Sequence, residues 1–394
     1  MEGVSRHNGK AMRFEEGVGQ FNEYFFFREF TFSNNTFRPD PKEELELADN
    51  IIWLDNVLIV FQLKERKSPV RTTAEAEERW FNNKVQRQAT RQMRNTLRYL
   101  RDQKEIELRN HAGHTSCLRP SEIDTIHKVV CYLADAALPQ SLRLQKCHRS
   151  RTGGLVHLIS YDDYLGIVRT LLTPPEVADY LSFRERVIER WEPEVAALPE
   201  QALVGQYLHG NVELRPSIEF TTNLSALDHR IEEWDMSSLI KLFPSRITGG
   251  DSTEYYCIVT EIAKLMRNEL RQFKIRFRLA MEMARSGTFA LPYRMACPRT
   301  ECGFVFVPLV DEFIPDRQQG LINLTLACKY DLRLPKCIGV SFAPEDGGWY
   351  SVEWCYTESP WTPDIQLEKM LGQSNPFRDV RTKEIDRYDY SGDV

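Results

Sequence analysis

The chain has 394 residues, of which 42% are hydrophobic and 27% are charged, with a formal net charge of -6. This balance is typical of a globular protein and excludes a protein that is basic throughout, although a local basic surface can still bind nucleic acid. No long uncharged apolar run predicts a membrane span, and the first twenty residues lack the features of a signal peptide. The nine scattered cysteines suggest reduced thiols. We therefore expect a cytoplasmic location and no membrane partner.

Apolar spacing predicts a helix over residues 14–28, followed by a buried extended segment through Phe30 and Phe32. The polar stretch 33–42 contains two prolines and predicts a loop. Residues 45–64 are rich in β-branched and aromatic residues on both sides of an Asp-Asn pair, which predicts a β-hairpin.

The remaining pattern mixes helices and strands. It predicts a long helix over 72–104, strands over 129–133 and 155–160, a helical region over 161–190 interrupted by two prolines, a helix over 251–285 and a strand-rich segment from residue 288. Two prolines between Trp191 and Glu200 end the helical pattern and predict a domain boundary there. We therefore expect an α/β (α+β) chain with domains over residues 1–195 and 200–394.

The hairpin brings three polar side chains together. If residues 55–56 form its two-residue turn, counting back along both strands places Asp49 opposite Gln62. Lys64 has the same parity as Gln62 and therefore shares its face, diagonal to Asp49. Because both strands are apolar on each face, these polar groups are expected to be partly buried, which is costly unless they are paired or bind a metal.

These groups fit the hydrolysis of a phosphodiester. Asp49, the side-chain oxygen of Gln62 and the backbone carbonyl of Leu63 are oxygen ligands of the kind that Mg²⁺ prefers. Such a metal acidifies a bound water and neutralises phosphate charge. Lys64 is suited to orient or deprotonate that water and to offset transition-state charge.

Asp49 followed thirteen residues later by Gln62-x-Lys64, across a hairpin and after a helix with acidic residues, resembles the PD-(D/E)xK nuclease superfamily. The Gln-x-Lys variant is similar to its Mrr-like, restriction-endonuclease-like branches. Ala48 stands where the motif has Pro, and Gln62 replaces an acidic residue. The resemblance covers roughly residues 14–165. It implies an αβββαβ core, here followed by a second α+β domain for recognition or assembly.

The resemblance also implies a function. Members are Mg²⁺-dependent (or Mn²⁺-dependent) endonucleases that cleave DNA, commonly in restriction, anti-phage defence or repair. A Glu in the first helix often joins the site. Glu23 is the expected residue here, with Glu29 as the alternative, whereas Glu15 and Glu16 are expected to lie further from the strands.

The long helix predicted after the hairpin separates charge from apolar residues. Its basic residues recur every three or four positions, which predicts one basic face, at Lys84, Arg87, Arg91, Arg94, Arg98 and Arg101. Gln88 and Gln92 lie at the border of this face, and the resemblance implies that one of them approaches the site. A basic stripe of this kind can follow a phosphate backbone, so we expect DNA contact here.

Two other functions stay open. Because Gln62 removes one carboxylate, the domain could bind nucleic acid without cutting it. The acidic net charge also suits an interaction or scaffold protein whose hairpin site is vestigial. A homodimer and a partner protein are both compatible with the sequence.

Overall fold

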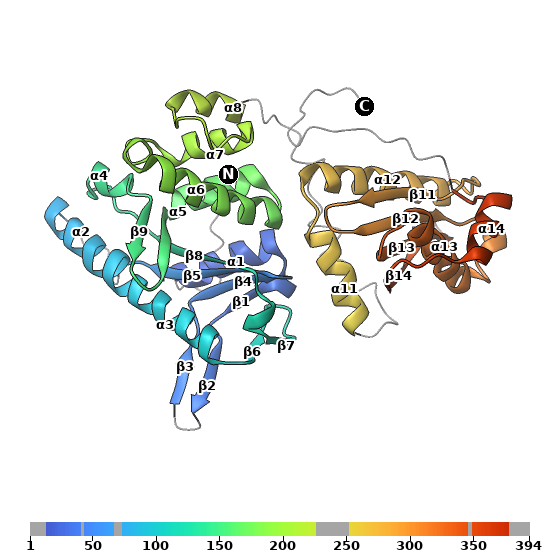
Figure 1. Ribbon diagram of the computed structural model, residues 1–394, viewed down its shortest axis with the longest axis horizontal. Coiled ribbons are helices and arrows are strands. Elements are labelled where there is room, and N and C mark those ends of the chain that lie inside the picture. The colour runs from blue at the N-terminus through green and yellow to red at the C-terminus, as the bar shows by residue number, and fades with distance from the viewer. Residues whose placement is uncertain (1–12, 41–42, 67–72, 226–251, 346–348, 378–394) are drawn as a thin grey trace. The chain divides into compact units, whose positions relative to one another are not determined.

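The computed structural model describes residues 13–40, 43–66, 73–225, 252–345 and 349–377. Within these ranges the chain forms two compact units, one made of the described residues up to 225 and the other of those from 252 (Figure 1). Both are mixed helix-and-strand units, which confirms the predicted fold class.

A six-stranded mixed sheet organises the first unit. Its strands, in spatial order, are β1 (Thr31–Ser33), β4 (Asn50–Leu54), β5 (Val57–Lys64), β8 (Thr125–Tyr132), β10 (Gly154–Ser160) and β9 (Cys147–Ser150). The first three strands are antiparallel, β5, β8 and β10 are parallel, and β9 is antiparallel to β10. The β4–β5 turn has Asp55 at a φ of 55°, a conformation that Asp tolerates.

Helices cover both faces of this sheet (Figure 1). The main ones are α1 (Phe14–Phe26), α2 (Ala74–Trp80), the π-helix η2 (Phe81–Gln88), α3 (Ala89–Asp102), α5 (Tyr161–Leu171), α6 (Pro174–Val195) and α7 (Glu200–His209). Shorter elements are η1 (Arg28–Phe30), η3 (Pro120–Glu122), α4 (Gln140–Arg143), η4 (Ile218–Thr221) and α8 (Thr222–Ser225). The long helix predicted over 72–104 is therefore confirmed as a continuous run of α2, η2 and α3.

In chain order, α1, β1, β4, β5, α3 and β8 give the predicted αβββαβ sequence of elements. The loop predicted over residues 33–42 is wrong in part, because β2 (Thr36–Asp40) pairs there with β3 (Glu43–Glu46). Proline is tolerated in this two-stranded ribbon because an edge strand leaves some N–H groups unused. A second ribbon joins β6 (Ile106–Arg109) to β7 (Thr115–Leu118).

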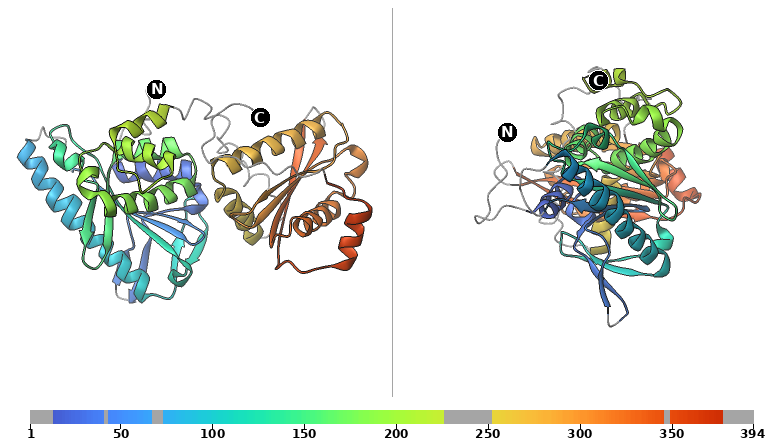
Figure 2. Two further views of the ribbon diagram at one scale, coloured as in Figure 1. Left: turned by 45° about the horizontal axis from the view of Figure 1, so that its top comes forward. Right: turned by 90° about the vertical axis from the view of Figure 1, so that its left-hand side faces the viewer.

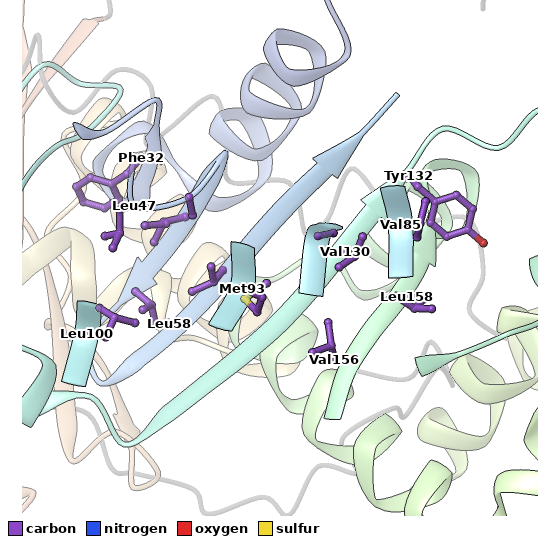
Figure 3. Packing of buried hydrophobic residues seen from close by; sticks show 14 of the residues in the cluster. Phe32, Leu47, Leu58, Val85, Met93, Leu100, Val130, Tyr132, Val156 and Leu158 are labelled. Atoms are coloured by element: carbon purple, nitrogen blue, oxygen red, sulfur yellow. The ribbon is translucent and has the colours of Figure 1, made fainter. Parts of the chain in front are cut away.

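The apolar stripe of α2, η2 and α3 packs on one face of the sheet. Val85, Met93 and Leu100 point at Leu58 and Val130 on the strands, within one buried cluster (Figure 3). Burial of these side chains positions the helix because each contributes roughly 1.5–3 kcal/mol. The opposite, basic side of the helix is left at the surface.

The other face holds a buried ion pair. Arg184 of α6, fully buried, donates to Glu200 of α7 through Nε (2.6 Å) and Nη2 (3.1 Å). Lys146 lies 3.2 Å from the same carboxylate. Burial alone would raise the pKa of Glu200, but the charges of Arg184 and Lys146 outweigh it and hold that pKa well below 4.5.

This ion pair shows that the domain boundary predicted between residues 195 and 200 is wrong. Glu200 and the rest of α7 belong to the first unit, which also includes η4 and α8. A Cβ on Gly205 of α7 would lie 1.9 Å from the carbonyl oxygen of Phe220, so these segments are in direct contact. Pro193 lies inside α6, close to its end, and Pro199 directly precedes α7, so neither proline ends the domain.

The second unit has a four-stranded mixed sheet. Its strands, in order, are β11 (Tyr293–Cys297), β12 (Cys302–Pro308), β13 (Lys336–Glu345) and β14 (Trp349–Glu358). Its helices are α11 (Ser252–Ala263), α12 (Arg267–Arg285), η5 (Asp311–Phe313), α13 (Arg317–Asp331) and α14 (Ile365–Gln373). Figure 2 shows α12 and α13 on opposite faces of the sheet. Throughout the described ranges, no helix is both long and apolar enough to cross a bilayer.

We predict that Glu200→Gln destabilises the protein by about 3–5 kcal/mol, because Arg184 would be left as a buried charge without its counter-ion. Glu213→Gln is the matched control, since its ion pair with Arg190 is more than half exposed and should contribute less than about 1 kcal/mol. Urea denaturation of the full chain measures both. Equal, small effects would contradict the importance of the buried pair.

Candidate active site

The carboxylate of Asp49 joins the two strands of the hairpin at their open end. Its Oδ2 accepts a hydrogen bond from the backbone N–H of Leu63 (2.5 Å) and lies 3.2 Å from Nζ of Lys64. The same Nζ donates to the carbonyl oxygen of Leu63 (2.8 Å). Asp49 and Lys64 are nearly buried, with side chains 10% and 12% exposed. The structure therefore brings together the carboxylate and ammonium that hairpin counting placed side by side.

Gln62 is the third member of this group. The register Asn50–Phe61 is the last pair of the two strands, so Gln62 follows directly at the position opposite Asp49. Its side chain is 2% exposed, and Oε1 has no hydrogen-bond partner among the described residues. A buried amide oxygen in this state costs roughly 1–3 kcal/mol. Such an oxygen is suited to bind a cation or an ordered water.

Among the acidic residues of the first helix, Glu15 is the one whose pKa responds to the charges of Asp49 and Lys64. Burial and the negative charge of Asp49 both raise the pKa of Glu15, while Lys64 lowers it, so its carboxyl lies within electrostatic range of the site. Glu23 instead lies 3.6 Å from Arg28 and 3.4 Å from Nδ1 of His111. The predicted residue, Glu23, therefore has its ion-pair contacts with Arg28 and His111, and no contact of it with Asp49, Gln62 or Lys64 is seen among the described residues.

Glu29 and Glu16, the other acidic residues considered near the first helix, have different surroundings from Glu15. Glu29 is buried in η1, and Glu16 pairs with Arg13 at the surface.

Glu46, which precedes Asp49 by three residues, has a pKa raised by partial burial, by Asp49 and by Glu15. Sequence reasoning missed Glu46 as a neighbour of the site, although its spacing before Asp49 was visible.

Helix α3 approaches the same end of the hairpin. Thr96 donates its hydroxyl to the carbonyl oxygen of Leu47 (2.5 Å), two residues before Asp49. Gln92 lies one turn earlier, and its buried Oε1 also has no hydrogen-bond partner in the described part of the chain. Gln88, another turn back at the end of the π-helix, accepts from Lys84 (3.0 Å). Of the two glutamines predicted at the border of the basic face, Gln92 is therefore the one whose side-chain oxygen accepts no hydrogen bond from a described residue.

The basic stripe forms as predicted. Its members are exposed on the outer side of η2 and α3, at Lys84, Arg87, Arg91, Arg94, Arg98 and Arg101. Gln88 and Gln92 are partly exposed at its border. The stripe therefore runs along the outer side of the helix that also approaches Asp49 through Thr96.

The donor set fits a hard divalent cation in part. Both interactions of Asp49 fall on Oδ2, which leaves Oδ1 for a ligand, and Oε1 of Gln62 needs a partner. The carbonyl of Leu63 already accepts from Lys64 but keeps a second lone pair. Among the described residues, the carboxylates of Glu15, Glu46 and Asp49 do not all lie within 4.8 Å of one another, so they form no compact set of three carboxylates.

We predict that Gln62→Met raises the free energy of unfolding by about 1–2 kcal/mol in the absence of metal, because it removes a buried oxygen without a partner. Gln206→Met is the control: Gln206 also has a buried unpaired oxygen, but its amide nitrogen donates to the carbonyls of Asn211 and Leu214. That variant should be less stable than wild type. Chelator-treated protein in urea measures both, and a destabilised Gln62→Met would contradict the assignment.

Comparisons of this chain with protein-family models, curated proteins and solved structures gave no match in any of the three. The geometry of the chain's own residues is therefore what bears on its function. The three features that bear on it are the Asp49–Lys64 pair, the buried oxygen of Gln62 and the exposed basic stripe.

Proposed function

We propose that the first unit is a metal-dependent nuclease of the PD-(D/E)xK type, which hydrolyses phosphodiester bonds in DNA. The observation that carries this proposal is the nearly buried Asp49–Lys64 pair beside an amide oxygen that has no protein partner. A buried polar group without a partner is rare in a folded protein, and a bound ion or water is one explanation for it. The order αβββαβ supports the same proposal.

In this mechanism Oδ1 of Asp49, Oε1 of Gln62 and the carbonyl oxygen of Leu63 would hold Mg²⁺ or Mn²⁺. When bound, the ion would lower the pKa of a water and neutralise phosphate charge. Lys64, held 2.8 Å from the Leu63 carbonyl, would place its ammonium against the phosphate and offset the charge that develops during attack. The N–H of Leu63 holds Oδ2 of Asp49 and so fixes the carboxylate's orientation.

The exposed stripe on η2 and α3 would hold the DNA backbone. From Lys84 to Arg98 the helix rises about 20 Å, which spans roughly six phosphates of one strand at 3.4 Å each. Five of the six stripe residues are arginine, whose planar group binds phosphate oxygens in pairs. The second unit would then serve recognition or assembly, alone, in a homodimer or with a partner protein.

Gln62 favours one alternative, a domain that binds DNA without cutting it. A neutral amide oxygen binds Mg²⁺ more weakly than a carboxylate does, because it lacks the charge. Both functions use the basic stripe to bind DNA, and they differ in whether the bound DNA is cleaved. Salt-dependent DNA binding without cleavage in any divalent metal would decide for the alternative.

We predict that wild-type protein cleaves plasmid or linear DNA in Mg²⁺ or Mn²⁺ and that Asp49→Asn reduces the rate by at least about 100-fold, because the ligand charge at Oδ1 is lost. Asp55→Asn is the matched control, since it makes the same change at the turn of the same hairpin, where Asn also tolerates a positive φ. Its rate should stay within about two-fold of wild type. Equal rates in wild type and Asp49→Asn would rule out this site.

We also predict that Arg87→Gln with Arg91→Gln weakens duplex binding and lowers the slope of log affinity against log salt by about 2, because two phosphate contacts are lost. Fluorescence anisotropy with labelled duplex in Ca²⁺ measures the slope. The control is Arg169→Gln with Arg186→Gln, two exposed arginines on α5 and α6. A control that lowers the slope equally would show that binding follows net charge and not the stripe.

A further inference from the structure

A chain of hydrogen bonds joins α5, α1 and the edge of the first sheet. The hydroxyl of Tyr164 in α5 donates to Oδ1 of Asn22 in α1 (2.6 Å), and Nδ2 of Asn22 donates to Oδ1 of Asn50 in β4 (2.7 Å). Nδ2 of Asn50 donates in turn to Oγ of Ser33 (2.7 Å), the last residue of β1. Tyr164 and both asparagines are buried, so each donor needs its acceptor.

The chain continues from Ser33 through His111 to Glu23. Oγ of Ser33 lies 2.9 Å from Nε2 of His111, and Nδ1 of His111 lies 3.4 Å from Oε2 of Glu23. A carboxylate can only accept, so Nδ1 carries the ring proton and Nε2 of the neutral imidazole is an acceptor. Because Asn50 donates to one lone pair of the Ser33 hydroxyl, the hydrogen of that hydroxyl is left for Nε2. Hydroxyl, imidazole and carboxylate stand in the order that activates a serine nucleophile.

Solvent reaches the end of the chain that holds these three groups. The side chains of His111 and Glu23 are 21% and 32% exposed, and Ser33 is partly exposed at the end of the edge strand β1. Asn34 follows with a φ of 51°, a left-handed conformation that ends the strand beside the hydroxyl. A Cβ on Gly19 of α1 would lie 3.1 Å from Oγ of Ser33, so the glycine leaves room there. A small substrate can therefore approach Oγ.

We propose that Ser33, His111 and Glu23 form a second active site, which hydrolyses activated carboxylic esters. Ser33 is the nucleophile and His111 is the general base, while Glu23 is a positioning residue that holds the imidazole through Nδ1. Arg28 lies 3.6 Å from Oε1 of Glu23, the oxygen that does not face His111, and so holds the carboxylate in place. The site is separate from the proposed metal site and does not depend on nuclease activity.

The reaction uses only these side chains and water. Oγ of Ser33 bonds to the carbonyl carbon of the ester, and its proton passes to Nε2 of His111. The bond to the alcohol then breaks as His111 gives that proton to the alcohol oxygen. Water attacks the acyl group in the same way, which releases the acid and restores Ser33. Nδ2 of Asn50 has a second N–H without an acceptor among the described residues, within reach of the oxyanion beside Oγ.

Labelling of the full chain with a fluorophosphonate probe tests the nucleophile. Oγ of Ser33 bonds to phosphorus and fluoride leaves, so each chain gains one stable adduct that mass spectrometry can locate. We expect the adduct on Ser33 of wild type, and labelling at least about 100-fold slower in His111→Ala, whose fold is checked by circular dichroism. No adduct on Ser33 of wild type would overturn the proposal, and so would equal labelling rates in a folded His111→Ala.

Hydrolysis of p-nitrophenyl acetate tests the other two roles, with a chelator present so that the metal site does not contribute. Ser33→Ala and Glu23→Gln should each lower the rate above background by at least about 100-fold, the second because it removes the charge that keeps the proton on Nδ1.

Two variants are matched controls for this assay. Ser182→Ala removes a hydroxyl that lies 3.5 Å from Nε2 of His127, and Glu16→Gln makes the same change as Glu23→Gln in an exposed ion pair of the same helix. Both should stay within about two-fold of wild type. Equal rates in Glu23→Gln and Glu16→Gln, or in the two serine variants, would contradict the site and leave the hydrogen-bond chain with a structural role alone.

Discussion

The hydrogen bond from the Leu63 N–H to Asp49 is the interaction on which the candidate site depends. The backbone ladder of the hairpin ends at Asn50 and Phe61, so the N–H of Leu63 needs another acceptor in a buried position. The side chain of Asp49 supplies it. This hydrogen bond fixes Oδ2 of Asp49 and leaves Oδ1 for a ligand. The ammonium of Lys64 lies beside the same carboxylate, and it would lose its contacts with Oδ2 and with the Leu63 carbonyl if it moved away.

Some buried polar groups of the first unit satisfy one another, and others have no partner among the described residues. On the face opposite α3, Arg184, Lys146 and Glu200 satisfy one another, and the charge of the carboxylate is retained by its two cationic neighbours. On the α3 face, Gln62 and Gln92 keep buried oxygens that nothing in the described chain satisfies. Natural structures keep few such groups, and a bound ion or an ordered water is one explanation for those that persist.

Much of the site followed from local rules of the sequence. A hairpin with a two-residue turn fixes its own register, so counting from residues 55–56 placed Asp49 against Gln62 and Lys64. The 3.6-residue period likewise separated the buried and exposed faces of α3. Glu15 could not be chosen over Glu23 in the same way, because both lie on one helix and only tertiary packing decides which of them responds to the charges of Asp49 and Lys64.

Other features depend on contacts between distant segments. Prolines 193 and 199 gave a local boundary signal, but Glu200 pairs with Arg184 and Lys146, and sequence distance hides such pairs. The group formed by Glu23, Ser33 and His111 is hidden for the same reason, since the fold brings Ser33 and His111 together from positions 78 residues apart.

The measurement that tests the nuclease assignment most directly is the Mg²⁺ dependence of DNA cleavage by wild type and by Gln62→Glu. If the oxygen of Gln62 is a metal ligand, a carboxylate there should bind the ion more tightly, and cleavage should reach half its maximal rate at a lower Mg²⁺ concentration than in wild type. Cleavage by Gln62→Glu alone would identify the natural chain as a binding module. No metal-dependent cleavage by either protein, with both folded, would contradict the account.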